Sequence, residues 1–390
     1  MKHLFGWFPR FGPGPSASST DHPTSGFTKL NLKDTLVLKG IAIGAIALHN
    51  YYHVLGPVKE NEFEFDPARY IVFLHSIQDP RQTLQALFSF LGHYGVQIFI
   101  FLSAYGLARR HWETPRRWSD FMWSRAKKIY PTFFLAILAW ALYMGLGGVN
   151  PLGIIGQNFG MLTLTVLGVQ NIVPGVDLPP IGPWWFFPFI MQFYALWPSL
   201  RLIVKRYDIQ GLLVLSGSSI ALLYIANDVL VARWWINLLE TPIGHMPEIC
   251  LGIFVGRYGV FPGKAAGLIG GAILVGGNIH RALWPLSFVG ALLLMVWLYQ
   301  IVGQRLRRWT FLEQLGICSG ALFFVNGFVR MPFVAMAQQR TWVYGLLLGF
   351  ASTAVAILVA RLLYRVEGRL RGAKHGDGAP PEPRPASRAG

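Results

Sequence analysis

The sequence predicts an all-α, polytopic membrane protein, and its composition is the first reason. Of its 390 residues, 53% are hydrophobic and only 13% are charged, and the mean hydropathy is +0.42. In soluble proteins, roughly a quarter of all residues are charged. The apolar residues also fall in uncharged blocks of membrane-spanning length. Because a helix satisfies its own backbone hydrogen bonds in lipid, we expect helices in these blocks. An ordinary soluble domain is excluded.

Ten candidate spans follow one another along the chain. Single spans are predicted in residues 40–58, 82–108, 210–226, 238–256, 265–280, 282–304, 314–329 and 341–360, and two more in 129–200, with a connection near 147–183. Within residues 129–200 the only charged residue is Asp177. At about 20 residues per span, about half of the chain lies in the bilayer.

The distribution of Lys and Arg predicts how these spans are oriented. When successive loops are assigned to alternate sides, 27 of the 34 Lys and Arg residues fall on the side that holds both termini. The positive-inside rule makes this side the cytoplasm. We therefore expect a multi-pass protein of the cytoplasmic (inner) membrane. The same rule explains the basic pI of 10.1, so the expected partner is the lipid bilayer and not nucleic acid.

Composition divides the chain into three segments. Residues 1–28 are rich in Gly, Pro and Ser and lack a long apolar core, so they predict a flexible cytoplasmic N-terminus and not a cleavable signal peptide. Residues 29–371 hold all the candidate spans. Residues 372–390 are rich in Pro and predict a disordered cytoplasmic tail. Cys250 and Cys318 lie in apolar blocks and are expected to be buried hydrophobic residues, not a disulfide pair.

The first span carries the leading candidate site. Ionisable side chains inside a bilayer are energetically unfavourable, so they indicate function. Lys39 begins the span, and His49 lies ten residues, about 15 Å, further along. His49 is a candidate proton acceptor, and the alternative is a packing histidine. His49 and His53 share a helix face, but without nearby carboxylates they lead us to predict no metal site.

A basic stretch before the third span is the second candidate. Arg125 and Lys128 are three residues apart, and Tyr130 and Pro131 follow them. One interpretation is a pocket that grips a phosphate-rich cytoplasmic ligand. The other is a clamp on the lipid headgroups.

Later spans contain further polar residues. Gln192 lies in the middle of an apolar block and needs a polar partner. Glu248 is a carboxylate well inside another block, where it is either neutral or paired with a buried base. In contrast, the acidic residues of the first outer loop, 60–66, are expected to form a solvated face, and the alternative is an acidic rim for a ligand.

Taken together, these motifs resemble the acyltransferase type 3 family of integral membrane O-acyltransferases over about residues 30–365. The resembling elements are Lys39–His49, Gly95–Ala104, Arg125–Pro131, Trp185–Pro198, Pro247–Gly252 and Leu315–Asn326. The chain also departs from the family pattern. The family histidine often stands eleven residues after the first basic residue, where this chain has Asn50. Ile190 and Met191 replace two carboxylates, and Gly320 and Asn326 replace a late Tyr and His.

The resemblance implies an O-acetyltransferase domain over residues 29–371. The donor would be cytoplasmic acetyl-CoA, and the acceptor would be a hydroxyl of a cell-envelope glycan, such as an exopolysaccharide or lipopolysaccharide sugar. His49 would act as general base or transient acyl carrier, and Glu248 would orient a base. The resemblance assigns CoA binding to Lys39, Arg125, Lys128 and Tyr130, and substrate binding to Gln192, Tyr194 and Asn326.

One other class of protein also explains polar residues in mid-membrane. A non-enzymatic transporter of a lipid-linked sugar or small solute places them there too. It predicts an internal repeat between the two halves of the chain, which the sequence does not show, and it leaves the basic stretch before Tyr130 unexplained. The sequence does not predict the oligomeric state.

Overall fold

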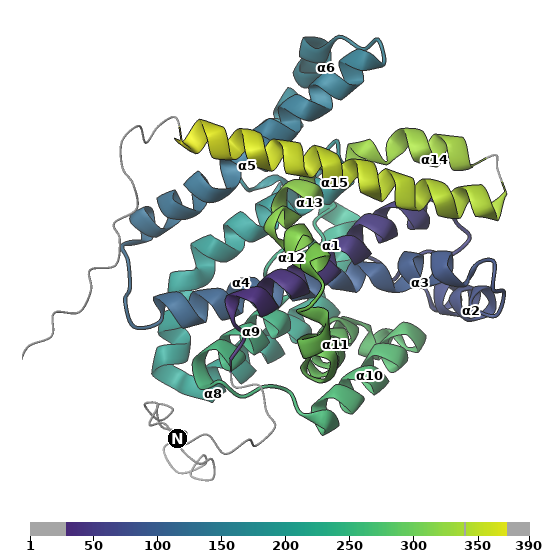
Figure 1. Cartoon of the computed structure of the whole chain (residues 1–390). Helices are drawn as coiled ribbons and strands as arrows, with labels where there is room; N and C mark the ends of the chain where they lie inside the picture. The colour runs from purple at the N-terminus through teal and green to yellow at the C-terminus, as the bar shows by residue number, and fades with distance from the viewer. Residues whose placement is uncertain (1–28, 339–340, 373–390) are drawn as a thin grey trace, which may run out of the picture.

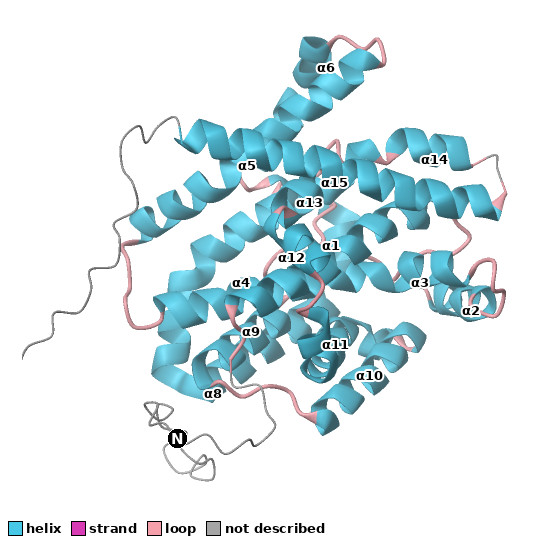
Figure 2. Cartoon of the chain, viewed as in Figure 1, coloured by secondary structure: helices cyan, strands magenta, loops and turns pink. Residues whose placement is uncertain are grey.

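The computed structural model describes residues 29–338 and 341–372, and these residues contain helices and loops but no strand (Figure 2). The predicted all-α class is confirmed. The predicted flexible segment 1–28, and the predicted tail beyond residue 372, lie outside the described residues.

The α-helices are α1 (Leu32–Leu55), α2 (Pro67–Ser76), α3 (Thr83–Leu91), α4 (Gly95–His111), α5 (Trp118–Leu146), α6 (Pro151–Gln157), α7 (Phe159–Val166), α8 (Phe186–Trp234), α9 (Met246–Tyr258), α10 (Lys264–Ile279), α11 (Trp284–Leu306), α12 (Thr310–Ile317), α13 (Ser319–Val329), α14 (Met331–Ala337) and α15 (Trp342–Gly372). Short 3₁₀ turns are η1 (Gly92–Tyr94), η2 (Gln170–Ile172), η3 (Gly182–Trp185), η4 (Leu238–Glu240) and η5 (Arg281–Leu283). Each of the ten predicted blocks contains helix.

Several helical segments are long and apolar enough to cross a membrane. In the described residues there are five, Thr83–His111, Trp118–Leu146, Gly182–Trp234, Arg281–Leu306 and Trp342–Arg371, and a sixth if α12 and α13, which are bent by 80° at their junction, form one broken span. The chain is therefore a multi-pass membrane protein. The predicted count of ten and the predicted orientation stay predictions.

Two predicted blocks differ in detail from the structure. Helix α9 begins at Met246, so residues 238–245 of the predicted span form η4 and a loop instead. The predicted connection near 147–183 contains the short helices α6 and α7, and α6 projects from the rest of the molecule (Figure 1).

Helix α8 contains a sharp bend that joins two predicted spans. Asp208 has non-helical backbone angles (φ 54°, ψ −135°). Residues eight apart in a straight helix are separated by about 12 Å. A Cβ atom on Gly211 would instead lie 3.3 Å from the carbonyl oxygen of Ile203. The helix is therefore broken where the sequence places the loop between the fourth and fifth spans.

Long-range hydrogen bonds between helix ends fall into two groups. One group joins the ends that the charge pattern assigns to the cytoplasm: Leu30 with Tyr105, Asp34 with Arg307, and Arg371 with the carbonyls of Lys127 and Lys128. The other joins segments assigned to the outer side: Asn61 with Trp284, Asn237 with Phe63, and Tyr52 with Leu346. The alternating loops thus lie at opposite ends of the helix bundle. We call these the inner and the outer end, after the prediction.

Helix α1 lies in the middle of the molecule, against α3, α4, α12, α13 and α15 (Figure 1). Its neighbours approach closely because glycines stand at the contacts, both on α1 and on the segments packed against it. A Cβ on Gly92 would lie 2.6 Å from the Cβ of His49, and a Cβ on Gly40 would lie 2.0 Å from the carbonyl oxygen of Leu312. The approach at Gly92 places the backbone of η1 directly against the candidate histidine.

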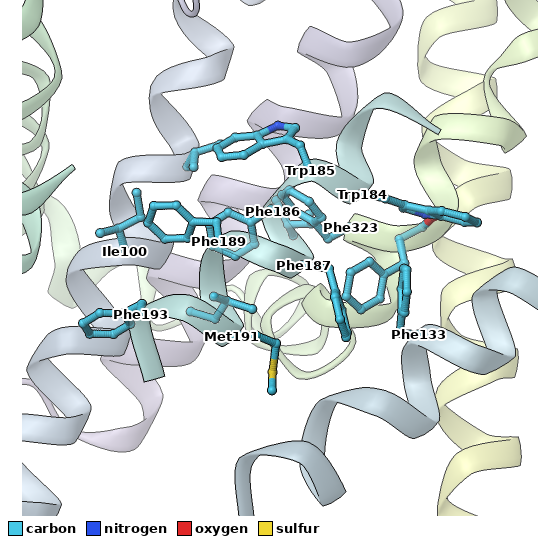
Figure 3. Packing of buried hydrophobic residues seen from close by; sticks show 14 of the residues in the cluster. Ile100, Phe133, Trp184, Trp185, Phe186, Phe187, Phe189, Met191, Phe193 and Phe323 are labelled. Atoms are coloured by element: carbon cyan, nitrogen blue, oxygen red, sulfur yellow. The ribbon is translucent and has the colours of Figure 1, made fainter. Parts of the chain in front are cut away.

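Stacked aromatic rings hold α5, α8 and α13 together (Figure 3). The rings of Phe133 and Phe187 stack with centroids 4.1 Å apart, and Phe186 lies 5.1 Å from Phe323. Trp184 is fully buried and donates its indole N–H to the carbonyl of Phe324 at 2.8 Å. Such rings bury much apolar area in fixed geometry. This packing fixes three helices that carry candidate site residues.

Candidate active site

Basic side chains from three helices gather at the inner end. We call Lys39 of α1, Arg110 of α4, and Arg125 and Lys128 of α5 the cationic cluster. Lys39 is close enough to Lys128, and Lys128 to Arg125 and Arg110, for their charges to repel. In the described part of the chain, the other full charges that act on these side chains belong to further arginines. Positive side chains that gather from three helices favour a polyanionic ligand.

Arg125 is held by contacts from other helices. Its guanidinium donates to Nε2 of His111 at 3.0 Å. Its central carbon lies 5.0 Å from the ring centre of Phe121 and 5.5 Å from that of Tyr194. Tyr194 in turn hydrogen-bonds to Ser103. Three motif elements that are distant in the sequence therefore meet at Arg125, and the predicted substrate-binding residue Tyr194 lies with the predicted CoA-binding residues.

Tyr130 lies apart from this cluster. Its hydroxyl donates to the carbonyl of Val166 at 2.6 Å, and its ring lies 5.2 Å from the ring of Phe187. The contacts of Tyr130 therefore connect α5 with α7 and α8, and none of them joins the cationic side chains.

His49 is buried near the outer end of α1, and its contacts define its tautomer. Its side chain is 3% exposed. Its Nδ1 atom lies 3.2 Å from the carbonyl oxygen of Phe88 and 3.1 Å from that of Ser89. These carbonyls belong to the last turn of α3, where helix carbonyls lack helical partners. Since carbonyls only accept, Nδ1 carries the proton, and the lone pair of a neutral His49 is on Nε2.

Two further histidines and a glutamate surround His49. The ring of His53 stacks on His49 with centroids 4.8 Å apart, and the ring of His93 lies 5.6 Å away. His53 donates through Nδ1 to a carboxylate oxygen of Glu60 at 3.2 Å. The chain turns back at Gly56, whose φ of 64° suits glycine, and so returns Glu60 to α1. We call His49, His53, His93 and Glu60 the histidine cluster.

Several buried polar atoms around this cluster have no hydrogen-bond partner among the described residues. They are Nε2 of His53, Oε2 of Glu60, Oγ of Ser89, and Nε and Nη1 of Arg330. Unpaired buried polar atoms are rare and require an explanation. Their concentration beside the lone pair of His49 indicates a place where a polar ligand binds.

The loop that carries Glu60 differs from the expected solvated acidic face. The Glu64 side chain is 70% exposed and fits that expectation, but the Glu60 side chain is only 16% exposed. Burial acts to raise the pKa of Glu60, but the hydrogen bond from His53 and the nearby imidazoles hold that pKa below its ordinary value. Glu60 is therefore a carboxylate inside the cluster.

Glu248 does not join the histidine cluster. It is 1% exposed, and one of its carboxylate oxygens lies 3.6 Å from Nδ1 of His245. Among the described residues, the titratable groups that act on His49 are His53, Glu60 and His93. Glu248 is thus next to a buried base, as the sequence suggests, but this base is His245 and not His49.

Gln192 and Asn326 each find a polar partner. Gln192 donates to the carbonyl of Gly168 at 2.9 Å and to the amide oxygen of Asn171 at 2.6 Å, which fixes a loop against α8. Asn326 accepts a hydrogen bond of 2.7 Å from Asn50. Of the predicted substrate-binding residues, only Asn326 is therefore near the histidine cluster, through the residue that follows His49.

Comparison with known proteins identifies the family. A family model of the acyltransferase domain matches residues 37–361. The chain belongs to this acyltransferase family. The match spans α1 to most of α15 and includes both clusters, so it confirms the resemblance seen in the sequence and indicates a membrane acyltransferase. No match is found among curated proteins or among solved structures.

Sequence reasoning missed part of the site. His93 and Arg330 received no role, and Glu60 was assigned to a solvated face. The usable signal was chemical, since His93 is an ionisable residue inside an apolar block and Arg330 directly follows another. No local pattern places Glu60 on His53, because that contact depends on how the loop after Gly56 folds back.

Proposed function

We propose that the chain transfers an acyl group, in the first place acetyl, from cytoplasmic acyl-CoA to a hydroxyl of an extracytoplasmic glycan. The observation that carries this proposal is the arrangement of α1. Its inner end lies in the cationic cluster through Lys39, and its outer end bears His49 with a free Nε2 lone pair. The two residues are about 15 Å apart along one buried helix.

The cationic cluster suits the donor. Acyl-CoA carries several phosphate charges, which the side chains of Lys39, Arg125 and Lys128 would hold. Arg125 offers a planar fork for phosphate oxygens, and its stacking on Phe121 and Tyr194 limits the orientations of that fork. The phosphates stay at the inner end, and the extended arm of CoA carries the thioester toward His49.

The histidine cluster suits the chemistry at the acceptor. Nε2 of His49 takes the proton of the acceptor hydroxyl as the oxygen attacks the thioester carbonyl. The carbon–sulfur bond then breaks, and the thiolate of CoA receives a proton. In the second version of the mechanism, Nε2 itself accepts the acyl group, releases CoA, and passes the acyl group to the hydroxyl. Both versions need the proton to stay on Nδ1, where the carbonyls of Phe88 and Ser89 hold it.

The test is acetyl transfer by the purified protein in liposomes. Labelled acetyl-CoA is supplied on one side and a mixed cell-envelope glycan fraction on the other, and both the release of CoA thiol and the labelling of glycan are measured. We expect both in the wild type and neither in His49→Ala. His75→Ala, which changes an exposed histidine on α2, is the matched control and should keep full activity.

Two results would contradict the proposal. If the folded wild type neither binds nor consumes acetyl-CoA but moves a glycan or a solute across the liposome, the protein is a transporter. If His49→Ala retains activity, the acyltransferase assignment stands but the role of His49 is wrong.

A further inference from the structure

We propose that His49, His53 and Glu60 form a binding site for a divalent transition-metal ion, with Zn²⁺ as the best fit, and that the bound ion blocks acyl transfer. Each of these residues can offer one ligand atom such that all three atoms lie within 4.8 Å of one another. Binding stands on this geometry alone. Inhibition rests on the proposed function, because the ion would occupy the nitrogen that must accept the proton.

The donor set is one that zinc accepts. Two histidines and one glutamate, with a fourth position left open, are a recurring zinc ligand set. In a tetrahedral site with bonds of about 2.1 Å, ligand atoms lie about 3.4 Å apart. The three ligand atoms, which lie within 4.8 Å of one another, would have to move closer together when the ion binds.

The histidines are already oriented for metal binding. Ligating histidines usually donate their other ring N–H to a backbone carbonyl or a carboxylate, which fixes the tautomer. His49 donates through Nδ1 to the carbonyls of Phe88 and Ser89, and His53 donates through Nδ1 to Glu60. In His49, Nε2 is therefore the available ligand atom. In His53 and Glu60, the two atoms joined by this hydrogen bond already lie side by side, and an ion that replaces the proton between them would bind to both. The Nε2 atom of His53 is buried without a partner, as is the second carboxylate oxygen of Glu60.

Two neighbouring ionisable groups bear on cation binding. Burial, and then the charges of Glu60 and Glu240, raise the pKa of Glu62 well above its ordinary value, so Glu62 favours the neutral form and adds no full charge to the site. The buried guanidinium of Arg330 also lies within electrostatic reach of Glu60 and opposes a cation. Arg330→Gln should therefore tighten metal binding, whereas loss of a ligand should weaken it. If Arg330→Gln lowers the dissociation constant for the metal while a ligand variant raises it, a general loss of structure cannot explain both effects.

The experiment is a metal titration of the full-length protein in detergent, purified with a tag that contains no histidine. Zn²⁺ or Co²⁺ competes with a chromophoric chelator, and the stoichiometry and dissociation constant are measured. We expect one ion per chain in the wild type. His53→Gln and Glu60→Gln should each weaken binding by about tenfold or more. His75→Gln and Glu64→Gln change exposed residues on the same side, and should leave binding unchanged.

The second readout is acetyl-CoA turnover with and without the ion. Zn²⁺ should inhibit the wild type, a chelator should restore activity, and Glu60→Gln should need at least about tenfold more Zn²⁺ for the same fractional inhibition. Metal binding by a protein without acyltransferase activity would overturn the proposed function and keep the site. Absence of one-to-one binding, or binding that both ligand variants leave intact, would overturn the site even if the protein is active.

Discussion

The cationic cluster and the histidine cluster share helix α1 but differ in charge and in partners. The cationic cluster brings like charges together, and aromatic rings and a neutral histidine hold its central arginine. The histidine cluster combines neutral imidazoles with a carboxylate and contains many unpaired buried atoms. Like charges repel unless an anion joins them, so the first cluster is built to hold charge. The second is built to move protons or to bind a polar group.

The largest expected effect separates the two clusters kinetically. His49→Gln removes the proton acceptor and should lower kcat by about 10²–10⁴-fold, while the dissociation constant for acetyl-CoA stays near the wild-type value. Turnover and equilibrium binding of labelled acetyl-CoA measure the two quantities. An equal loss of binding would show that His49 belongs to the donor site, and the division into two clusters would be wrong.

The cationic cluster should show the opposite pattern. Arg125→Gln removes a charged hydrogen-bonding group, which is worth about 1.5–3 kcal/mol, so KM for acetyl-CoA should rise about tenfold or more with a smaller change in kcat. The binding of acetyl-CoA by the wild type should also weaken with salt. Lys127→Gln is the matched control, since Lys127 is a cation on the same helix that packs on Trp123 instead. If both variants raise KM equally, the effect is general surface charge and not a specific pocket.

The outer end also contains an acidic side chain whose protonation affects stability. Burial, and then the negative charge of Asp177, raise the pKa of Glu240 to about 7. The folded state therefore holds this proton more tightly than the unfolded state, whose pKa is about 4.5. The contribution of Glu240 to stability is therefore fully present below pH 4.5, and about 1–3 kcal/mol of it is lost as the pH rises through about 7.

Thermal melts in detergent at pH 5 and pH 8 measure this difference. Wild type should lose more stability between the two values than Glu240→Gln, which cannot ionise. Glu64→Gln, at an exposed residue of the same end, should behave like wild type. Equal losses in all three proteins would show that Glu240 ionises as freely in the folded state as in the unfolded state.

The smallest expected effect concerns the asparagine pair beside the histidine cluster. Asn50 and Asn326 stand near positions where the family carries histidines, and here they bond to each other at 2.7 Å. Asn50→Ala and Asn326→Ala should each destabilise the protein by about 1 kcal/mol, and the double variant should lose less than the sum. Thermal melts of the wild type, the two single variants and the double variant give the stabilities that this double-mutant cycle needs. Additive losses would mean that the pair contributes no coupling.

Local sequence pattern correctly predicted features that depend on a single helix. The spacing of Lys39 and His49 follows from the helical rise, and the fold confirms that both lie on α1. The proximity of Arg125 and Lys128 likewise follows from their separation of three residues on α5. The apolar blocks predicted the all-α class, and the alternating charge of the loops predicted their grouping at two ends. Both patterns arise because apolar residues enter lipid while charged residues stay in water.

Only the tertiary structure decided which distant residues meet. Glu60 reaches His53 through a turn, His93 reaches His49 through the glycine contact of η1, and Asn326 reaches Asn50 across 276 positions of sequence. The same packing placed Tyr194 with Arg125, and Glu248 with His245. Such contacts depend on how whole helices pack, and side-chain spacing within one helix contains no information about its neighbours. The sequence therefore determined the helices and their charged ends, and the packing determined the chemistry between them.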